Sequence, residues 1–319
     1  MSKANGMAKK SLKQKLVTNL AELKVAVRNH WMLYLLIVPF ILWYVMFMYK
    51  PMYGLQIGFK EYDILTGITE SPWIGFAHFA EFLKDEFFWR AFGNTIMISA
   101  YDLLFGFPAP IILALLLNEV KNVKFKKTVQ TITYLPHFIS IVVIAGLVTN
   151  FLAPSGLVNN FIEMFGGERV YFLIKPEYFR SIFTAMNIFK GVGFGAVVYI
   201  AALAGVDPQL YEAASIDGAG KLKQLTNVTL PSIRPTIVVM LILKIGQLMS
   251  VSYEAILLLY QPATYSKGDV ISTYVYRSGM IEGRYDFATA VGLTNSIIAF
   301  ILVFISNKVS KKFAETSVW

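Results

Sequence analysis

Residues 205–235 read GVDPQLYEAASIDGAGKLKQLTNVTLPSIRP, a segment rich in glycine and proline that lies between two long apolar runs. Asp207 is a residue type that commonly caps a helix, and Pro208 suits the first helical position. We therefore predict a short helix over residues 209–217. Gly218 ends it, because glycine permits the tight turn that follows.

The second half of this segment predicts another short helix, over residues 221–229. Pro231 and Pro235 are expected to stop it and to start the next apolar run, since proline lacks the donor that a helix interior needs. Glu212 places a charge on the first helix, beside small residues that allow close approach of another protein. The segment thus predicts a compact helix–turn–helix connection.

The runs on either side of this segment belong to a chain that is 56% hydrophobic and only 15% charged, whereas soluble domains carry about 25% charged residues. A run of about 20 apolar residues is long enough to cross a bilayer as a helix. Six such runs predict an all-α integral membrane protein with six transmembrane helices, at residues 31–49, 92–117, 131–152, 181–204, 236–260 and 287–305.

The distribution of basic residues predicts the orientation of these helices. Of the 29 lysine and arginine residues, 17 fall in the two terminal segments and in the loops on the same side, and 10 fall in the three other loops. The richer side is expected to be cytoplasmic, so both termini face the cytoplasm. The net charge of +9 is therefore a topology signal, and no nucleic-acid partner is expected.

Three regions follow from this topology. Residues 1–30 are expected to form a cytoplasmic basic amphipathic segment on the inner membrane surface, the alternative being a partly disordered tail. Residues 31–307 form the six-helix transmembrane domain, which includes the loop 205–235. Residues 308–319 form a cytoplasmic tail.

The loop carries a family resemblance. The tripeptide Glu212-Ala213-Ala214, then Gly218 after three residues, then Val228-Thr229-Leu230-Pro231 after nine more, resembles the EAA loop of binding-protein-dependent ABC importer permeases. Val228 stands where isoleucine is usual, which keeps a β-branched apolar residue. The alternative is an ordinary connecting loop whose glycines and prolines serve turns only.

Other stretches extend the resemblance over nearly the whole chain from about residue 30. The segments PMYGLQIGFKEYD (51–63), SPWIGF (71–76) and TYLPHFIS (133–140) are similar to the polysaccharide/alginate-type branch of the sugar permeases. This branch implies a carbohydrate substrate, an oligo- or polysaccharide.

The resemblance implies a type I ABC importer permease fold in a bacterial cytoplasmic membrane. It also implies three kinds of protein partner: a second permease, forming a heterodimer; a cytoplasmic ABC ATPase dimer; and an extracytoplasmic solute-binding protein. The residues implied to couple transport to the ATPase are Glu212, Ala213, Ala214, Gly218, Leu230 and Pro231.

Nothing in the sequence predicts an enzyme. The phosphate-binding pattern G-x-x-x-x-G-K-[ST] is absent, and there is no cysteine for a thiolate site. We therefore expect no cofactor and no metal on this chain, with ATP and Mg²⁺ used by the partner ATPase.

Charged side chains within apolar runs are costly and usually face a cavity or a partner. Asp102, Lys190, Lys244 and Glu254 are such residues. We hypothesise that the fourth and fifth spans line the substrate path through Asn187, Lys190, Gln247, Tyr253 and Glu254. The alternative is that these groups pair with one another or with the second permease. Asp102, near a span end, fits that alternative best.

Glycines alternate at positions 191, 193 and 195 of the fourth span. They are expected to permit close helix packing there.

Two other functions remain compatible with the sequence. The EAA loop alone does not exclude a permease for another solute, such as a peptide. An ion-coupled secondary transporter predicts internal repeats and midplane ion ligands, and the two halves show no convincing repeat.

Overall fold

The computed structural model describes residues 28–314, with side chains to residue 311. Within this range helices form the regular structure, and the β pairing is one isolated bridge between Lys60 and Trp73. The chain divides into two compact units, residues 1–56 and residues 57–319. The amphipathic segment predicted over residues 1–30 lies, except for its last three residues, outside the described part.

The described part of the first unit is one long apolar helix. Its segments are α2 (Trp31–Tyr44), the π turn η1 (Val45–Tyr49) and α3 (Lys50–Met52), and the 3-10 helix η2 (Tyr53–Phe59) continues them. Hydrophobic side chains are exposed on every face of α2. A helix that is apolar all round suits lipid contact.

The second unit begins with short helices and continues with the longer ones. In chain order its elements are α4 (Gly67–Glu70), α5 (Ala77–Phe82), α6 (Glu86–Tyr101), η3 (Asp102–Gly106), α7 (Pro108–Glu119), α8 (Val123–Phe138), α9 (Ile141–Leu152), α10 (Leu157–Met164), η4 (Phe172–Ile174), α11 (Pro176–Ala204), α12 (Pro208–Ile216), α13 (Lys221–Gln224), η5 (Leu225–Thr229), α14 (Leu230–Gly246), α15 (Tyr253–Leu259), η6 (Pro262–Thr264), α16 (Tyr265–Gly268), α17 (Ile271–Tyr276), η7 (Arg277–Ile281) and α18 (Tyr285–Ala314).

Among the described residues, six helices are long and apolar enough to cross a membrane. They are Trp31–Phe59, Glu86–Glu119, Ile141–Met164, Pro176–Ala204, Lys221–Gly246 and Tyr285–Lys311. The predicted all-α membrane architecture and the number of spans are confirmed. Two of the predicted spans, however, are interrupted within their predicted bounds.

The third span was expected over residues 131–152, but α8 ends at Phe138 and a new helix begins at Ile141. Ile139 takes an extended conformation, and the Ser140 hydroxyl accepts a hydrogen bond from the Val143 amide at the start of α9. Residues 135–148 are apolar except for His137 and Ser140, so hydropathy alone did not reveal this turn.

The fifth span, expected over residues 236–260, is also interrupted. It ends at Gly246, and helix resumes only at Tyr253. A backbone break within an apolar region needs partners for its polar groups. Here side chains of three other helices donate hydrogen bonds to the carbonyls of the break. Ser99 of α6 donates to Leu248, Asn295 of α18 donates to Met249 at 3.0 Å, and Ser272 of α17 donates to Val251 at 2.6 Å.

The core of the second unit is built around α11. This helix packs against α7, α8 and α14, while α14 also packs along α18. Gly193 faces the backbone of Thr133 in α8 so closely that a Cβ atom would overlap it, and a Cβ atom at Gly195 would touch Pro110. A Cβ atom at Gly191 would meet nothing. The predicted close packing therefore holds for the second and third of these glycines.

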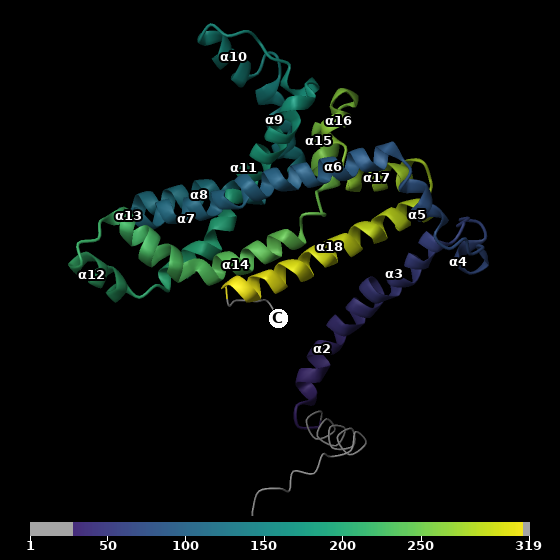
Figure 1. Ribbon diagram of the computed structural model, residues 1–319, viewed down its shortest axis with the longest axis horizontal. Coiled ribbons are helices and arrows are strands. Elements are labelled where there is room, and N and C mark those ends of the chain that lie inside the picture. Colours follow the sequence, from purple (N-terminus) through teal and green to yellow (C-terminus); the bar gives the residue numbers. More distant parts are fainter. Residues whose placement is uncertain (1–27, 315–319) are drawn as a thin grey trace, which may run out of the picture. The chain divides into compact units, whose positions relative to one another are not determined.

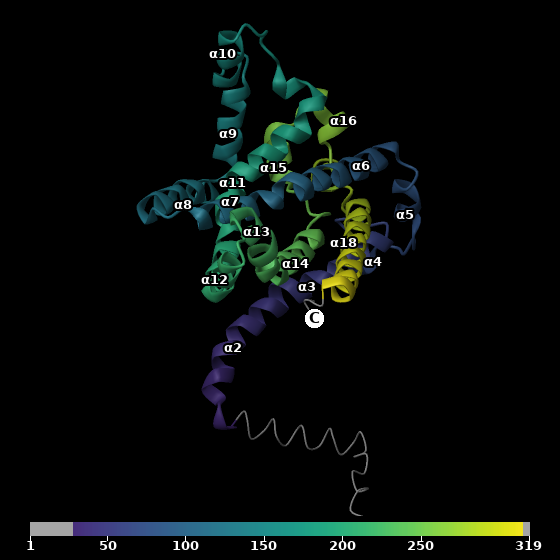
Figure 2. The same ribbon diagram turned by 60° about the vertical axis from the view of Figure 1, so that its left-hand side comes forward.

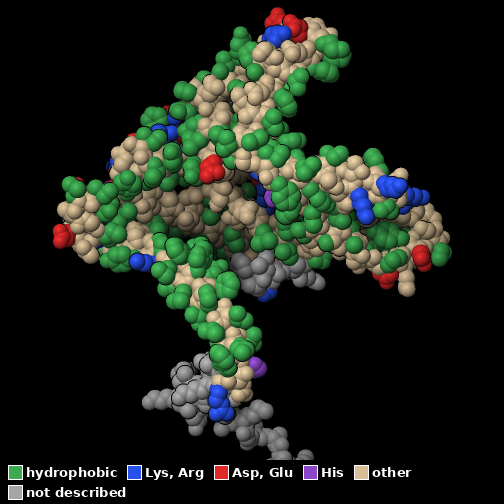
Figure 3. All heavy atoms as spheres, turned by 180° about the vertical axis from the view of Figure 1, so that it is seen from behind, with side chains coloured by type: hydrophobic (Ala, Val, Ile, Leu, Met, Phe, Trp, Pro, Cys, Tyr) green, Lys and Arg blue, Asp and Glu red, His purple; other side chains and the backbone are tan. Residues whose placement is uncertain are grey.

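The ends of the second unit differ in character. In both ribbon views α12 and α5 lie at opposite ends of residues 57–319 (Figures 1 and 2). Basic side chains gather at the end that carries α8 and α13 (Figure 3). Hydrophobic side chains cover much of the rest of the face shown in Figure 3. This distribution suits a helical unit that crosses a membrane between two polar ends.

Candidate functional site

The loop at residues 205–235 forms a short, well-defined helix. The Asp207 carboxylate caps α12 by accepting a hydrogen bond from the Gln209 amide at 2.9 Å, and Pro208 occupies the first helical position. Gly218 has φ of +75°, a backbone conformation that favours glycine. The helix and its glycine turn correspond to the pattern predicted from the sequence.

The second half of the loop differs from the prediction. α13 continues through the π turn η5 into α14, so Pro231 and Pro235 lie inside one continuous helix, Lys221–Gly246. The expectation that these prolines stop a helix was wrong. The π turn shifts the hydrogen-bond pattern just before Pro231, and such adjustments let membrane helices tolerate proline.

Side-chain hydrogen bonds fix α12 against this continuous helix. The Tyr211 and Thr229 hydroxyls lie 3.1 Å apart, within hydrogen-bond distance. The Gln224 amide donates to the Ser215 hydroxyl at 2.9 Å and to the Ala219 carbonyl at 3.0 Å. These hydrogen bonds therefore hold both α12 and the turn that follows it against the helix Lys221–Gly246.

The outer surface of the loop is available to another protein. Glu212, Ala213, Gly218 and Pro231 are exposed, while Ala214 and Leu230 are half-buried. Two large apolar side chains are also unusually exposed: Ile216 at 86% and Leu222 at 74%. The exposed surface of the loop therefore combines apolar side chains with the Glu212 carboxylate.

A polar cavity of about 120 Å³ lies where the fifth span is interrupted. Its polar lining comes from α6 and η3 (Ser99, Asp102), from α11 (Asn187), from the end of α14 (Lys244) and from the break itself (Gln247, Ser250, Ser252).

An ion pair forms one wall of this cavity. Lys244 Nζ lies 2.5 Å from Asp102 Oδ2, and both side chains are about two-thirds buried. Asp102 begins the π turn η3, and a Cβ atom at Gly106 would overlap its carboxylate. Gly106 therefore leaves room for the Asp102 carboxylate to lie against the π turn η3.

The five predicted path residues occupy three different environments. Asn187 and Gln247 line the cavity. Lys190 instead donates to the carbonyls of His137 at 3.0 Å and Ile139 at 2.7 Å. Tyr253 stacks on Tyr276, with ring centroids 5.3 Å apart, and Glu254 is exposed; neither lines the cavity.

The break in the fifth span explains part of this outcome. Glu254 was expected close to the same helix face as Lys244, but the two residues lie on different helices, α15 and α14. Sequence reasoning also missed the serines of the cavity. The signal was the polar cluster Gln247, Ser250 and Ser252 within an otherwise apolar run, which marks the break itself.

These features define an all-helical, multi-pass membrane protein with an exposed, rigid loop at one end and a polar cavity between its helices. Residues 106–313 match the family described as the binding-protein-dependent transport system inner membrane component. The chain belongs to this family, and its fold is the predicted type I ABC importer permease fold.

Relatives and a solved structure show the same similarity over nearly the full length. The chain is 41% identical over 289 residues to Protein LplB of Bacillus subtilis (strain 168), covering 90% of this chain and 91% of that protein. It is 41% identical over 288 residues to the polygalacturonan/rhamnogalacturonan transport system permease protein YteP of the same organism, covering 90% of each.

The solved structure is a crystal structure of a bacterial alginate ABC transporter in complex with an alginate pentasaccharide-bound periplasmic protein. A chain of that structure matches with a TM-score of 0.85 and 48% sequence identity. The match covers 92% of this chain and 98% of that chain.

Proposed function

We propose that this chain is the permease subunit of an ATP-driven importer that carries an oligo- or polysaccharide across the cytoplasmic membrane of a bacterium. Residues 31–307 form the transmembrane domain, and residues 1–30 and 308–319 face the cytoplasm. The loop 205–235 docks a cytoplasmic ATPase. The family membership and the carbohydrate transporters among the similar proteins support this assignment.

The observation that carries the ATPase contact is the construction of α12. A coupling element must transmit force, so it must be exposed to its partner and rigidly joined to the membrane helices. α12 is capped at Asp207 and is hydrogen-bonded to the helix that continues as the fifth span. Movement of α12 therefore passes directly to α14, which borders the polar cavity.

The size of the cavity supports a second permease as a partner. At about 120 Å³ the cavity is smaller than the roughly 300–1,000 Å³ of ordinary ligand pockets. A related permease facing the same break supplies the missing volume, and the two form a heterodimer. An extracytoplasmic binding protein, like the periplasmic protein in the alginate transporter structure, delivers the sugar.

The cavity also offers suitable chemistry for a sugar. Asn187, Gln247 and the nearby serines provide neutral donors and acceptors, which match hydroxyl groups. We propose that Asn187 and Gln247 contact the substrate. The ion-coupled and peptide alternatives have no comparable observation in their favour.

A cross-linking experiment tests the ATPase contact. The chain contains no cysteine, so a single Ala213→Cys substitution places the only thiol of this subunit on α12. In native membranes, a thiol-to-amine cross-linker should join this position to an ATP-hydrolysing protein. A single cysteine at the exposed Glu168, beyond α10, serves as the control and should not be joined to it. Transport by a purified complex that contains no ATPase would contradict the proposal.

A further inference from the structure

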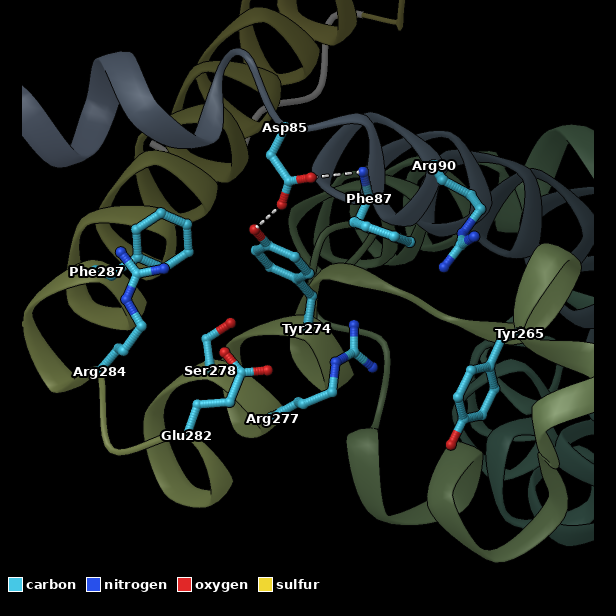
Figure 4. A pocket seen from close by; sticks show the side chains of 10 residues that line it. All are labelled: Asp85, Phe87, Arg90, Tyr265, Tyr274, Arg277, Ser278, Glu282, Arg284 and Phe287. Atoms are coloured by element: carbon cyan, nitrogen blue, oxygen red, sulfur yellow. Dashed lines mark hydrogen bonds between the residues drawn. The ribbon is translucent and has the colours of Figure 1, made fainter.

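Residues at the start of α6 line a second cavity. The start of α6 lies at the end of residues 57–319 opposite α12 (Figure 1). The volume of this cavity is about 340 Å³, and its walls come from α6, α16, α17, η7 and the start of α18. Figure 4 shows Arg90, Arg277 and Tyr265 around the same space. In the proposed orientation this cavity opens on the outer face of the membrane.

Two arginines of this cavity converge on one buried carboxylate. Arg277 donates to both oxygens of Asp269, at 3.2 and 2.9 Å, and Arg90 Nη2 lies 3.9 Å from Asp269 Oδ2. The Asp269 side chain is fully buried, whereas those of Arg90 and Arg277 are 36% and 27% exposed. The accessible part of the cluster is therefore cationic, with one positive charge in excess.

Arg90 supplies that excess charge. Its distance to Asp269 is too long for a hydrogen bond, and its Nε atom is buried without a hydrogen-bond partner. A guanidinium carries five donors in a planar fork, which suits a carboxylate. Because the Nε atom is buried, a ligand in the cavity meets the Nη atoms of this partly exposed guanidinium. Their positive charge favours an anionic ligand.

Three further charged groups line the cavity, Asp85, Glu282 and Arg284. Asp85 accepts hydrogen bonds from the Tyr274 hydroxyl at 2.5 Å and from the Phe87 amide at 2.9 Å (Figure 4). Burial, and then the hydrogen bond to Asp85, raise the pKa of Tyr274, which keeps it a neutral donor. Arg284 is paired with Glu81 at 2.7 Å, and two acidic groups, Asp85 and Glu282, remain in the lining.

Aromatic rings complete the cavity. The Arg90 guanidinium lies 4.9 Å from the centroid of the Phe87 ring, which holds it by a cation–π contact. Tyr265 packs against Tyr260, with ring centroids 4.6 Å apart, so its own ring is held in place. An aromatic face beside polar donors is a suitable surface for the apolar face of a pyranose ring.

We propose that this cavity binds a carboxylate-bearing sugar, a uronate residue of the imported saccharide. Arg90 binds the carboxylate, Arg277 lies beside it as a second donor, and Tyr265 packs against the ring. This inference rests on the proposed function, since it places the cavity on the side where substrate arrives. An acidic side chain of a docking protein would need only the guanidinium for binding. The concave shape and the aromatic walls of the cavity fit a sugar better than such a side chain.

Direct binding to the full-length chain tests this proposal. The chain is purified with its co-purifying subunits in lipid nanodiscs, and tri-galacturonate is titrated by calorimetry, with its methyl ester as the uncharged probe. Tri-galacturonate should bind, and the ester should bind at least about tenfold more weakly, as the loss of a charge-assisted pair predicts. Arg90→Gln should weaken tri-galacturonate binding to a similar extent, and Arg90→Lys less.

Arg169→Gln is the matched control, because it removes an equal charge from an arginine outside this cavity that is paired with Glu163 at 2.6 Å. It should leave binding unchanged. Equal binding of acid and ester, no binding of tri-galacturonate, or unchanged binding in Arg90→Gln would overturn the proposal. So would an Arg90→Gln variant that loses only its capture of the solute-binding protein. ATP-driven uptake of carbohydrate, measured separately, shows whether the proposed function itself fails.

Discussion

The role of Lys190 can be decided by one substitution. Its ammonium group donates to the carbonyls of His137 and Ile139, at the C-terminal end of α8. Carbonyls of a final helical turn lack intrahelical partners and lie at the negative end of the helix dipole. Two hydrogen bonds to a charged donor are worth about 1.5–3 kcal/mol each. Because Lys190 is only half-buried, we expect the lower part of that range, about 3–4 kcal/mol for both hydrogen bonds.

Lys190→Met keeps the length of the side chain and removes both hydrogen bonds. We predict that it lowers the thermal unfolding temperature of the purified complex and leaves the apparent KM for sugar uptake unchanged. Asn187→Ala, about one helical turn away on α11 and lining the cavity, should do the reverse. A Lys190→Met complex with unaltered thermal stability and a KM raised several-fold would refute this reasoning and assign Lys190 to the substrate path.

Three further predictions concern packing, the ion pair and the helix cap. Gly193→Ala should destabilise the complex by about 1–3 kcal/mol through overlap with α8, whereas Gly191→Ala, which meets open space, should not; equal melting temperatures would contradict this packing. Lys244→Met should lower the stability of the complex by about 1–3 kcal/mol, less than the loss of one partner of a fully buried ion pair. In a double-mutant cycle, adding Asp102→Asn should recover part of this stability. Additive effects of the two substitutions would exclude coupling between the residues. Asp207→Ala should destabilise α12 by about 1 kcal/mol. It should reduce the sugar-stimulated ATPase activity of the complex and leave membrane insertion normal. An unchanged rate of ATP hydrolysis would show that the cap is dispensable.

Much of the architecture could be predicted because it depends on local composition. An apolar run long enough to cross a bilayer has few alternatives, and Asp207, Pro208 and Gly218 act on the backbone next to them. These features need no knowledge of distant contacts. The number of spans and the helix at α12 were therefore predicted correctly.

The break after Gly246 was not predicted, although the polar cluster Gln247, Ser250 and Ser252 marks its place in the sequence. It persists because Ser99, Asn295 and Ser272 donate hydrogen bonds to its carbonyls from three other helices. Pro231 shows the opposite case, where a local signal for a helix end is overridden by the preceding π turn. Both outcomes depend on hydrogen bonds that only the assembled fold defines.

The candidate sites show the same limit. Asn187 and Gln247 could be selected because an amide within a membrane span needs a partner. The cluster of Arg90 and Arg277 could not, because α6 and η7 are separated by more than 170 residues and meet only around Asp269.

ATP-driven uptake into proteoliposomes tests the coupling role of α12 most directly. Gly218→Pro replaces a residue at φ of +75° with one restricted to negative φ, whereas Gly220→Ala alters a nearby glycine at φ of −68° with open space around it. We predict that both variants insert into the membrane normally, that Gly220→Ala transports labelled oligosaccharide at close to the unmodified rate, and that Gly218→Pro does not transport it. Undiminished ATP-driven uptake by Gly218→Pro would contradict the proposal that this loop couples the permease to an ATPase.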